Sequence, residues 1–269
     1  MLARWRAAGL VWPTVLTLLT LPVLIALGTW QWQRLTWKQG LIAKIEQRVK
    51  ATPSSYTLAL ADFLKTGDVE YLRISVTGTF DHANERHLYA PRASSQGWNV
   101  FTLLKPDGDQ PPVYVNRGWV PEKLKDPASR TEGQVTGPVT VTGLARADEK
   151  RSIFAAPDDP KGNRWYLRDT WVMRWGAEGV PPPDKMALMR IQGYAPFSLD
   201  AEAEPANPGG WPKGGTTEVR LPNSHLQYVV TWYGLALTLL VIFGVYARQR
   251  LSELSAGTVA GRDETPLQP

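Results

Sequence analysis

Two long apolar stretches lie toward the two ends of the chain, and a polar segment with a different periodicity separates them. No charged side chain occurs from Ala7 to Gln33, and none occurs from Leu221 to Ala247 if His225 is neutral. Each stretch is long enough to supply the ~20 residues with which a helix crosses a bilayer. A buried core helix is the alternative, but two such stretches of full membrane length favour spanning. We predict transmembrane helices at residues 10–30 and 226–247.

The first apolar stretch also resembles a secretory signal peptide. Arg4 and Arg6 precede it, and the small-residue sequence Ala26-Leu27-Gly28 near its end is similar to a cleavage site. However, the stretch is longer than a typical signal-peptide core and continues into an aromatic-rich segment. We therefore interpret it as an uncleaved anchor.

Basic residues beyond the outer end of each span indicate the orientation. Two arginines precede the first span and two follow the second, at positions 4, 6, 248 and 250. The positive-inside rule predicts that residues 1–9 and 248–269 are cytoplasmic and that residues 31–225 form an extracytoplasmic domain. Basic residues also occur between Arg34 and Lys50, but long loops are largely exempt from this rule. The polar segment Ser252–Pro269 is expected to be disordered.

The segment after the first span keeps a helical period and then changes to alternation. Leu41, Ile45 and Val49 form one apolar stripe, which predicts a helix over Thr36–Lys50 that ends before Pro53. Further along, short alternating or apolar runs bounded by turn residues predict strands. These runs are Leu72–Gly78, His87–Pro91, Trp98–Leu104, Pro112–Asn116, Val135–Ala145, Asn163–Arg168 and Leu188–Gln192.

Strands dominate this part of the chain, with one further short helix expected at Asp169–Gly176. Short strands at such close spacing are typical of an antiparallel barrel or sandwich. The predicted fold class is thus a membrane protein in which two transmembrane α-helices flank a β-rich α+β extramembrane domain. The Pro- and Gly-rich stretch Pro205–Gly215 is expected to be a loop, to which we assign no role.

Composition narrows the possible chemistry. The 269 residues include no Cys, which excludes disulfides, thiolate metal sites and copper delivery through paired thiols. The net charge is only +5, and acidic and basic residues are interspersed between the spans. Because nucleic-acid binding needs a concentrated basic patch, we expect no nucleic-acid partner. Among the 12 Trp, several join tyrosines in a predicted interfacial belt at Trp30, Trp32, Trp37, Tyr228, Trp232 and Tyr233.

The sequence contains no recognisable catalytic motif, so we do not expect an enzyme. The adjacent carboxylates Asp148-Glu149 and Asp158-Asp159 lie in predicted loops, where such pairs are usually solvated. His82 and His87 flank a predicted turn in a polar context. We expect both of these side chains to be exposed or half-buried.

His225 is different because it lies within an uncharged stretch, at the beginning of the second span. In a helix it shares one face with Tyr228, Val229 and Trp232. Ionisable side chains near membrane depth are costly and are often functional. His225 is either an interfacial residue bonded to backbone or an axial metal ligand for a membrane-soluble porphyrin.

Two arginines also have two possible roles each, one structural and one in ligand binding. Arg34 is one turn from Trp30, and it is either a snorkelling interfacial side chain or part of a ligand site. Arg117 lies in the sequence Val115-Asn-Arg-Gly-Trp-Val-Pro121. It either belongs to a turn that Gly118 permits, or it holds a propionate through charge-assisted hydrogen bonds.

Four sequence blocks, taken in order relative to the two spans, resemble one known family. The chain is similar to the surfeit locus protein one family of cytochrome c oxidase assembly factors over nearly its whole length. The blocks are Gly28-Thr-Trp-Gln-Trp-Gln-Arg-Leu-Thr-Trp-Lys38, Pro91-Arg92 with Gly97-Trp-Asn-Val100, Val115-Asn-Arg-Gly-Trp-Val-Pro121 and Asn223-Ser-His-Leu-Gln-Tyr-Val-Val-Thr-Trp232. The third block is the most specific.

The resemblance implies a role in delivering haem a to the oxidase catalytic subunit, with His225 as the candidate ligand. We expect haem a to be held transiently by residues of the set His225, Tyr228, Trp232, Arg34 and Arg117. The expected partners are the oxidase catalytic subunit, the haem a synthase and membrane lipid. The alternative is a cofactor-free scaffold that stabilises the nascent catalytic subunit.

The resemblance also allows two membranes, the inner membrane of a bacterium and that of a mitochondrion. Residues before the first span lack the Arg- and Ser-rich amphipathic pattern of a mitochondrial transit peptide. We therefore expect the bacterial inner membrane, with the domain in the periplasm.

Overall fold

The computed structural model describes residues 2–92, 95–175, 195–217, 219 and 222–260. The chain forms two compact units, one made of Met1–Ile42 with Arg220–Pro269 and the other of Ala43–Val219. We call them the helical unit and the β-rich unit and describe each by itself.

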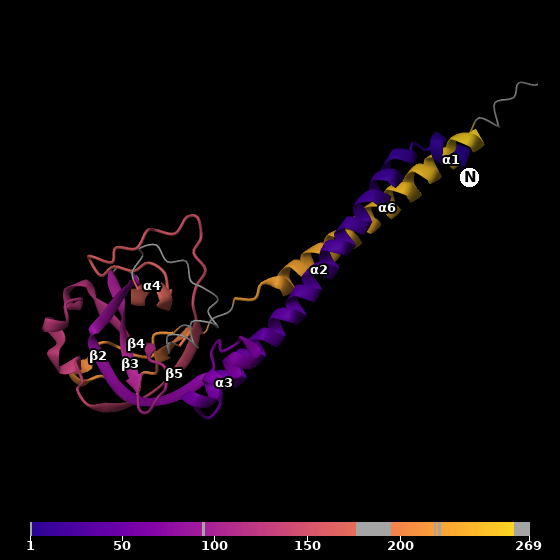
Figure 1. Cartoon of the computed structure of the whole chain (residues 1–269). Helices are drawn as coiled ribbons and strands as arrows, with labels where there is room; N and C mark the ends of the chain where they lie inside the picture. Colours follow the sequence, from indigo (N-terminus) through magenta and orange to yellow (C-terminus); the bar gives the residue numbers. More distant parts are fainter. Residues whose placement is uncertain (1, 93–94, 176–194, 218, 220–221, 261–269) are drawn as a thin grey trace, which may run out of the picture. The chain divides into compact units, whose positions relative to one another are not determined.

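Three helices make up the helical unit: α1 (Leu2–Ala7), most of α2 (Val11–Lys50) and α6 (His225–Ala260). Helices α2 and α6 lie side by side (Figure 1). Near α1, an apolar cluster joins α1 and the link that follows it to α6, with Ala8, Leu10 and Ala247 buried at its centre. Val229 and Ala236 of α6 are also buried.

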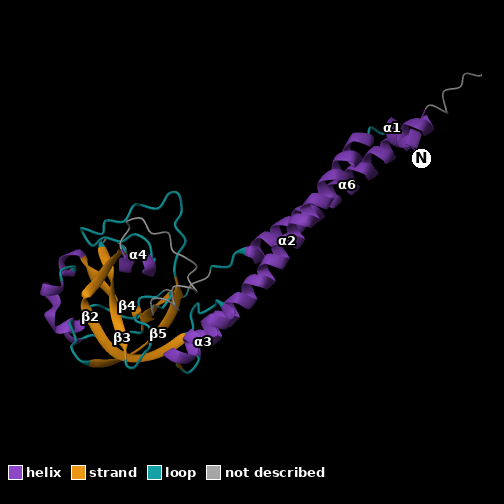
Figure 2. Ribbon diagram, in the orientation of Figure 1, coloured by secondary structure: helices purple, strands orange, loops and turns teal. Residues whose placement is uncertain are grey.

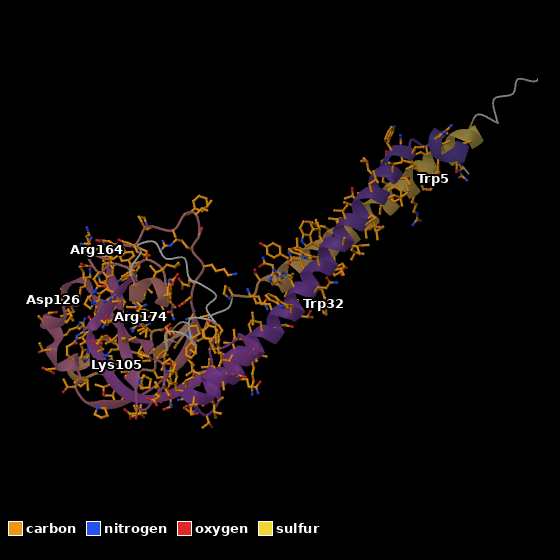
Figure 3. The ribbon with its side chains drawn as sticks, viewed as in Figure 1. Trp5, Trp32, Lys105, Asp126, Arg164 and Arg174 are labelled. Carbon is orange, nitrogen blue, oxygen red and sulfur yellow. The ribbon has the colours of Figure 1, made fainter. Side chains whose placement is uncertain are left out.

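The remaining apolar surface of α2 and α6 is exposed. Only 11% of the most apolar window of each helix is buried, and Leu19 and Val230 are 65% and 66% exposed. A core helix would bury such side chains, whereas hydrocarbon solvates them at no cost. The two helices are thus the predicted transmembrane pair. Trp5 and Trp32 lie toward opposite ends of this unit (Figure 3).

The β-rich unit is a small closed barrel (Figure 2). Its strands pair in the order β2-β3-β4-β6-β5, and a further pairing between β2 and β5 closes the circle. The pairs are antiparallel except β4 with β6, and the short β1, which adds to β2 in parallel. The strands are β1 (Ser54–Ser55), β2 (Arg73–Tyr89), β3 (Gly97–Pro106), β4 (Val113–Pro121), β5 (Pro138–Ala147) and β6 (Phe197–Ala201).

Helix α3 (Tyr56–Thr66) packs on the main core of this barrel and was not predicted. The Ser55 side chain accepts a hydrogen bond from the Leu58 backbone N–H at its first turn, and Gly67 ends it in a left-handed conformation. Tyr56, Ala59 and Leu60 of α3 join inward-facing apolar residues of the strands. The serine and glycine at the ends of an apolar stripe were the sequence signal for this helix.

A second apolar cluster lies against Phe101 and Tyr114 and includes Trp165 and Met173. Met173 belongs to α4 (Thr170–Trp175), which confirms the short helix expected here. Three 3-10 turns complete the described elements: η1 (Glu122–Leu124), η2 (Pro127–Gly133) and η3 (Pro208–Gly210).

The predicted barrel-like fold is confirmed, but the structure corrects its details. The expected strands Leu72–Gly78 and His87–Pro91 are parts of one long strand, β2, so the turn predicted between His82 and His87 is wrong. At this point the strand bulges, since Asp81 pairs with Leu103 and Arg86 pairs with Phe101. Four residues of β2 therefore lie opposite a single residue of β3. The polar composition of a bulge is similar to that of a turn.

Two further expectations differ from the structure, and one lies outside it. Asn163–Arg168 forms only isolated bridges, because Asn163 adopts a positive φ of 48° that interrupts an extended strand. The segment Ser252–Pro269, expected to be disordered, is helical as far as Ala260, since no glycine–proline signal ends α6 after Tyr246. The expected strand Leu188–Gln192 lies outside the described residues.

Candidate functional site

The helical unit holds four of the five predicted ligand-site residues. His225 is the first residue of α6. Val229 and Ala236 on the same helix are buried. With His225 and Trp232 they follow the i, i+4, i+7, i+11 stripe that faces α2. His225 and Trp232 are half-buried on this stripe, whereas Tyr228 lies beside it and is exposed.

Gln31 of α2 holds the His225 ring in place. The distance from His225 Nδ1 to Gln31 Oε1 is 2.8 Å. Since Oε1 only accepts hydrogen bonds, the pair selects the tautomer with the proton on Nδ1. The Nε2 atom then carries the lone pair, and no hydrogen bond to it occurs among the described residues. This is the arrangement in which a histidine ligates a metal through Nε2 and is oriented through Nδ1.

Gln31 was missed as a site residue at the sequence level. It lies within the block Gly28–Lys38, which was noted for its tryptophans and its arginine. The sequence feature that could have identified Gln31 was an amide side chain in a largely apolar helix, on the side that faces α6. Because the partner is 194 residues away in the chain, local spacing could not connect the two.

Exposed aromatic side chains occur around the same part of the helix pair. Arg34 places its guanidinium carbon 4.9 Å from the centre of the Trp37 ring, which is a cation–π contact. Arg34 itself is exposed and makes no ion pair among the described residues. The largely exposed aromatic residues are Trp30, Trp32, Trp37, Tyr228 and Tyr233. Such rings are suited to the membrane interface or to an apolar, planar ligand.

Arg117, the fifth predicted site residue, belongs to the β-rich unit. It is 1% exposed and lies in β4 at a bulge, since Phe101 pairs with Asn116 and Val100 with Gly118. Gly118 adopts a φ of 129°, as expected for a glycine that permits an unusual turn of the backbone. The structure thus places Arg117 inside the barrel, in a different unit from the other four.

The β-rich unit also contains a buried ionic cluster that was not predicted. Glu85 accepts a hydrogen bond from His87 at 2.7 Å and is bonded to both terminal nitrogens of Arg130. Burial alone would raise the pKa of Glu85, but the bonds from His87 and Arg130 lower it to about 2. His87 is only 4% exposed, so the expectation that it is exposed or half-buried is wrong. The bulge in β2 turns this polar segment inward.

His82 meets its expectation. Its side chain is half-buried and forms a hydrogen bond of 2.8 Å with the backbone carbonyl of Val135. No group of three or more side chains that could hold a metal ion occurs among the described residues. A site that needs three or more such ligands is therefore not formed by the described residues, whereas a haem iron can be held by one histidine.

Comparison with known proteins agrees with the family resemblance found in the sequence. A sequence model of the SURF1 family matches residues 18–237. Surfeit locus protein 1 of Homo sapiens is 36% identical over 237 residues, which cover 81% of this chain and 72% of that protein. The protein of the same name from Mus musculus is 37% identical over 224 residues, 78% of this chain and 67% of that protein. A SURF1-like protein of Monosiga brevicollis is 33% identical over 261 residues, with 92% and 91% covered.

Proposed function

Because the chain belongs to the SURF1 family, we propose that it assists the assembly of cytochrome c oxidase by holding haem a transiently in the membrane. The observation that carries this proposal is the His225–Gln31 pair, which leaves Nε2 of a histidine at the start of the second span without a partner among the described residues. The protein acts as a carrier, not as an enzyme.

The residues of the helical unit fit a haem group. Nε2 of His225 would bind the haem iron, and the hydrogen bond from Nδ1 to Gln31 would keep the proton on Nδ1 and orient the ring. Exposed aromatic rings such as Tyr228 offer apolar surface to a porphyrin. When bound, the haem supplies the iron that becomes part of the oxidase, and this chain contributes binding and orientation only.

The proposed partners follow from this role. The haem a synthase would supply the haem and the oxidase catalytic subunit would receive it, both within the bilayer. We place the protein in the inner membrane of a bacterium, with both ends of the chain in the cytoplasm and the β-rich unit in the periplasm. The paired arginines outside each span support this orientation.

The test is the haem content of the full chain purified in detergent from cells that make haem a. We expect a Soret band for the unmodified protein and its loss or shift in His225→Ala. His82→Ala is the matched control, because His82 bonds to a backbone carbonyl in the β-rich unit. An unmodified protein without haem, from cells with an active synthase, would overturn the carrier role.

A cofactor-free scaffold is the second candidate. The observation that favours it is the extent of exposed apolar surface on α2 and α6, which could pack against helices of the oxidase as well as lipid. A scaffold predicts loss of oxidase when this surface is changed, for example in Leu19→Asn, without any haem signal in the purified protein.

A further inference from the structure

A cavity that is partly open to solvent lies in the β-rich unit, where the barrel strands meet the loop of residues 204–208. Its volume is about 210 Å³. Phe80, Val115, Val139 and Val141 supply apolar walls from three strands, and Ala201 supplies another from β6. The cavity lies next to the main core, since Val115 belongs to that core and the other four pack against it.

Arg117 puts a buried positive charge on the wall of this cavity. Nη2 donates to the Gly133 carbonyl and, at 2.9 Å, to Asn207 Oδ1, which are both neutral acceptors. The guanidinium also lies over the Phe80 ring, 4.8 Å from its centre. Nε and Nη1 have no hydrogen-bond partner among the described residues, although both are buried.

No carboxylate of the described residues is bonded to the Arg117 guanidinium. Arg117 forms no ion pair there, and Glu85, the acid whose charge acts on it, is already bonded to His87 and Arg130. Burial lowers the pKa of Arg117 to about 10, so the side chain is still a cation at neutral pH. A buried cation with two unused donors is costly unless an acceptor from outside the chain satisfies it.

We propose that this cavity binds a small monocarboxylate with an apolar body, whose carboxylate accepts hydrogen bonds from Arg117. The apolar walls take the body of the ligand, and Nε or Nη1 takes the charged end. The inference goes beyond the proposed haem function and does not depend on it.

Size and charge define the ligand class. A volume of about 210 Å³ suits a short acid such as hexanoate. It is below the ~300 Å³ at which pockets for drug-sized molecules begin, and a porphyrin is larger still. Glu202, which is paired with Arg73, and Glu204 also line the cavity, and their charge opposes phosphates and other dianions more strongly than a monocarboxylate.

The loop from Pro205 to Gly215, to which the sequence assigned no role, completes the site. Pro205, Ala206, Asn207 and Pro208 line the cavity. Asn207 accepts from Arg117 and also donates through Nδ2 to the carbonyl groups of Arg117 and Pro212. The loop thus orients the guanidinium through one side chain.

Calorimetric titration of the haem-free full chain in detergent tests the proposal. We expect hexanoate to bind at least about tenfold more tightly than hexan-1-ol, which has the same chain but no charge. Arg117→Gln removes the cation, and Ala201→Leu fills the cavity while keeping the cation. Each should weaken hexanoate binding by at least about tenfold.

Two controls separate this site from other effects. Arg86→Gln changes another arginine that donates to a backbone carbonyl but does not line the cavity, and it should leave hexanoate binding unchanged. His225→Ala should also leave it unchanged, so that failure of the haem proposal and failure of this one are distinguishable.

Ala201→Leu keeps the test decisive if Arg117→Gln does not fold. Equal binding of hexan-1-ol and hexanoate, unchanged binding in folded Ala201→Leu, or no binding to the unmodified protein would each overturn the proposal. Palmitate that binds more tightly than hexanoate, in an Arg117-dependent way, would overturn the small-ligand assignment and identify a membrane lipid as the source.

Discussion

The Tyr233 ring of α6 lies directly against Gly28 of α2, and its hydroxyl is 3.0 Å from Thr29 Oγ1. A Cβ atom at position 28 would lie 3.0 Å from the ring carbons, which is tighter than ordinary contact. The glycine therefore lets the two transmembrane helices approach at this point, as small residues do at helix interfaces in membranes.

Gly28→Val is expected to weaken the pairing of α2 and α6. Overpacking at a tight contact typically costs about 1–3 kcal/mol. The thermal unfolding midpoint of the full chain in detergent, followed by tryptophan fluorescence, should fall. Gly234→Val is the control, because a Cβ atom at Gly234 meets nothing within 4 Å. Equal effects of the two variants would contradict the role of Gly28.

Gln31→Leu is expected to lower haem affinity without removing the ligand. Without the Gln31 acceptor, neither the position of the proton nor the orientation of the His225 ring is fixed. Loss of a residue that orients a metal ligand typically lowers metal affinity by about 10- to 100-fold. The measurement is haem titration of the purified protein, followed at the Soret band.

Gln33→Leu is the matched control for this prediction. Gln33 lies two residues along the same helix and is exposed. We expect its substitution to leave haem affinity unchanged. If Gln31→Leu bound haem as tightly as the unmodified protein, Gln31 would not orient the ligand.

The buried ionic cluster predicts acid sensitivity of the β-rich unit. The pKa of Glu85 is lowered to about 2 in the folded state, from an ordinary value near 4.5. A carboxyl group with a lowered folded-state pKa stabilises the fold above its unfolded pKa. That contribution is lost as the pH falls from about 4.5 to about 2. Urea unfolding of the full chain at a series of pH values measures this loss.

Glu85→Gln should remove much of this pH dependence. The variant leaves Arg130 buried without its carboxylate, so we expect a loss of about 3–5 kcal/mol in the free energy of unfolding at pH 7. Its stability should then change less than that of the unmodified protein between pH 5 and pH 3. Parallel pH profiles for the two proteins would show that another group causes the acid loss.

The orientation in the membrane can be tested because the chain has no cysteine. We expect single introduced cysteines to react with a membrane-impermeant thiol reagent according to their side. Lys105→Cys, at an exposed position of β3, should be labelled in intact spheroplasts. Ser252→Cys, exposed near the end of α6, should be labelled only after permeabilisation. The reverse pattern would invert the predicted topology.

The sequence by itself determined the two transmembrane helices and the strand-rich character between them. Both depend on local periodicity: uncharged runs of membrane length, and alternation such as that of Leu72, Ile74 and Val76. It also singled out His225, since an ionisable residue in an uncharged run is visible without a fold.

Only the tertiary structure decided which residues surround these positions. Gln31 meets His225 across 194 residues, and Arg117 meets Asn207 across 90. The bulge that buries Glu85 and His87 depends on the register of β2 against β3. Side-chain partners and strand register arise from contacts between distant segments, and such contacts leave no periodic pattern in either segment alone.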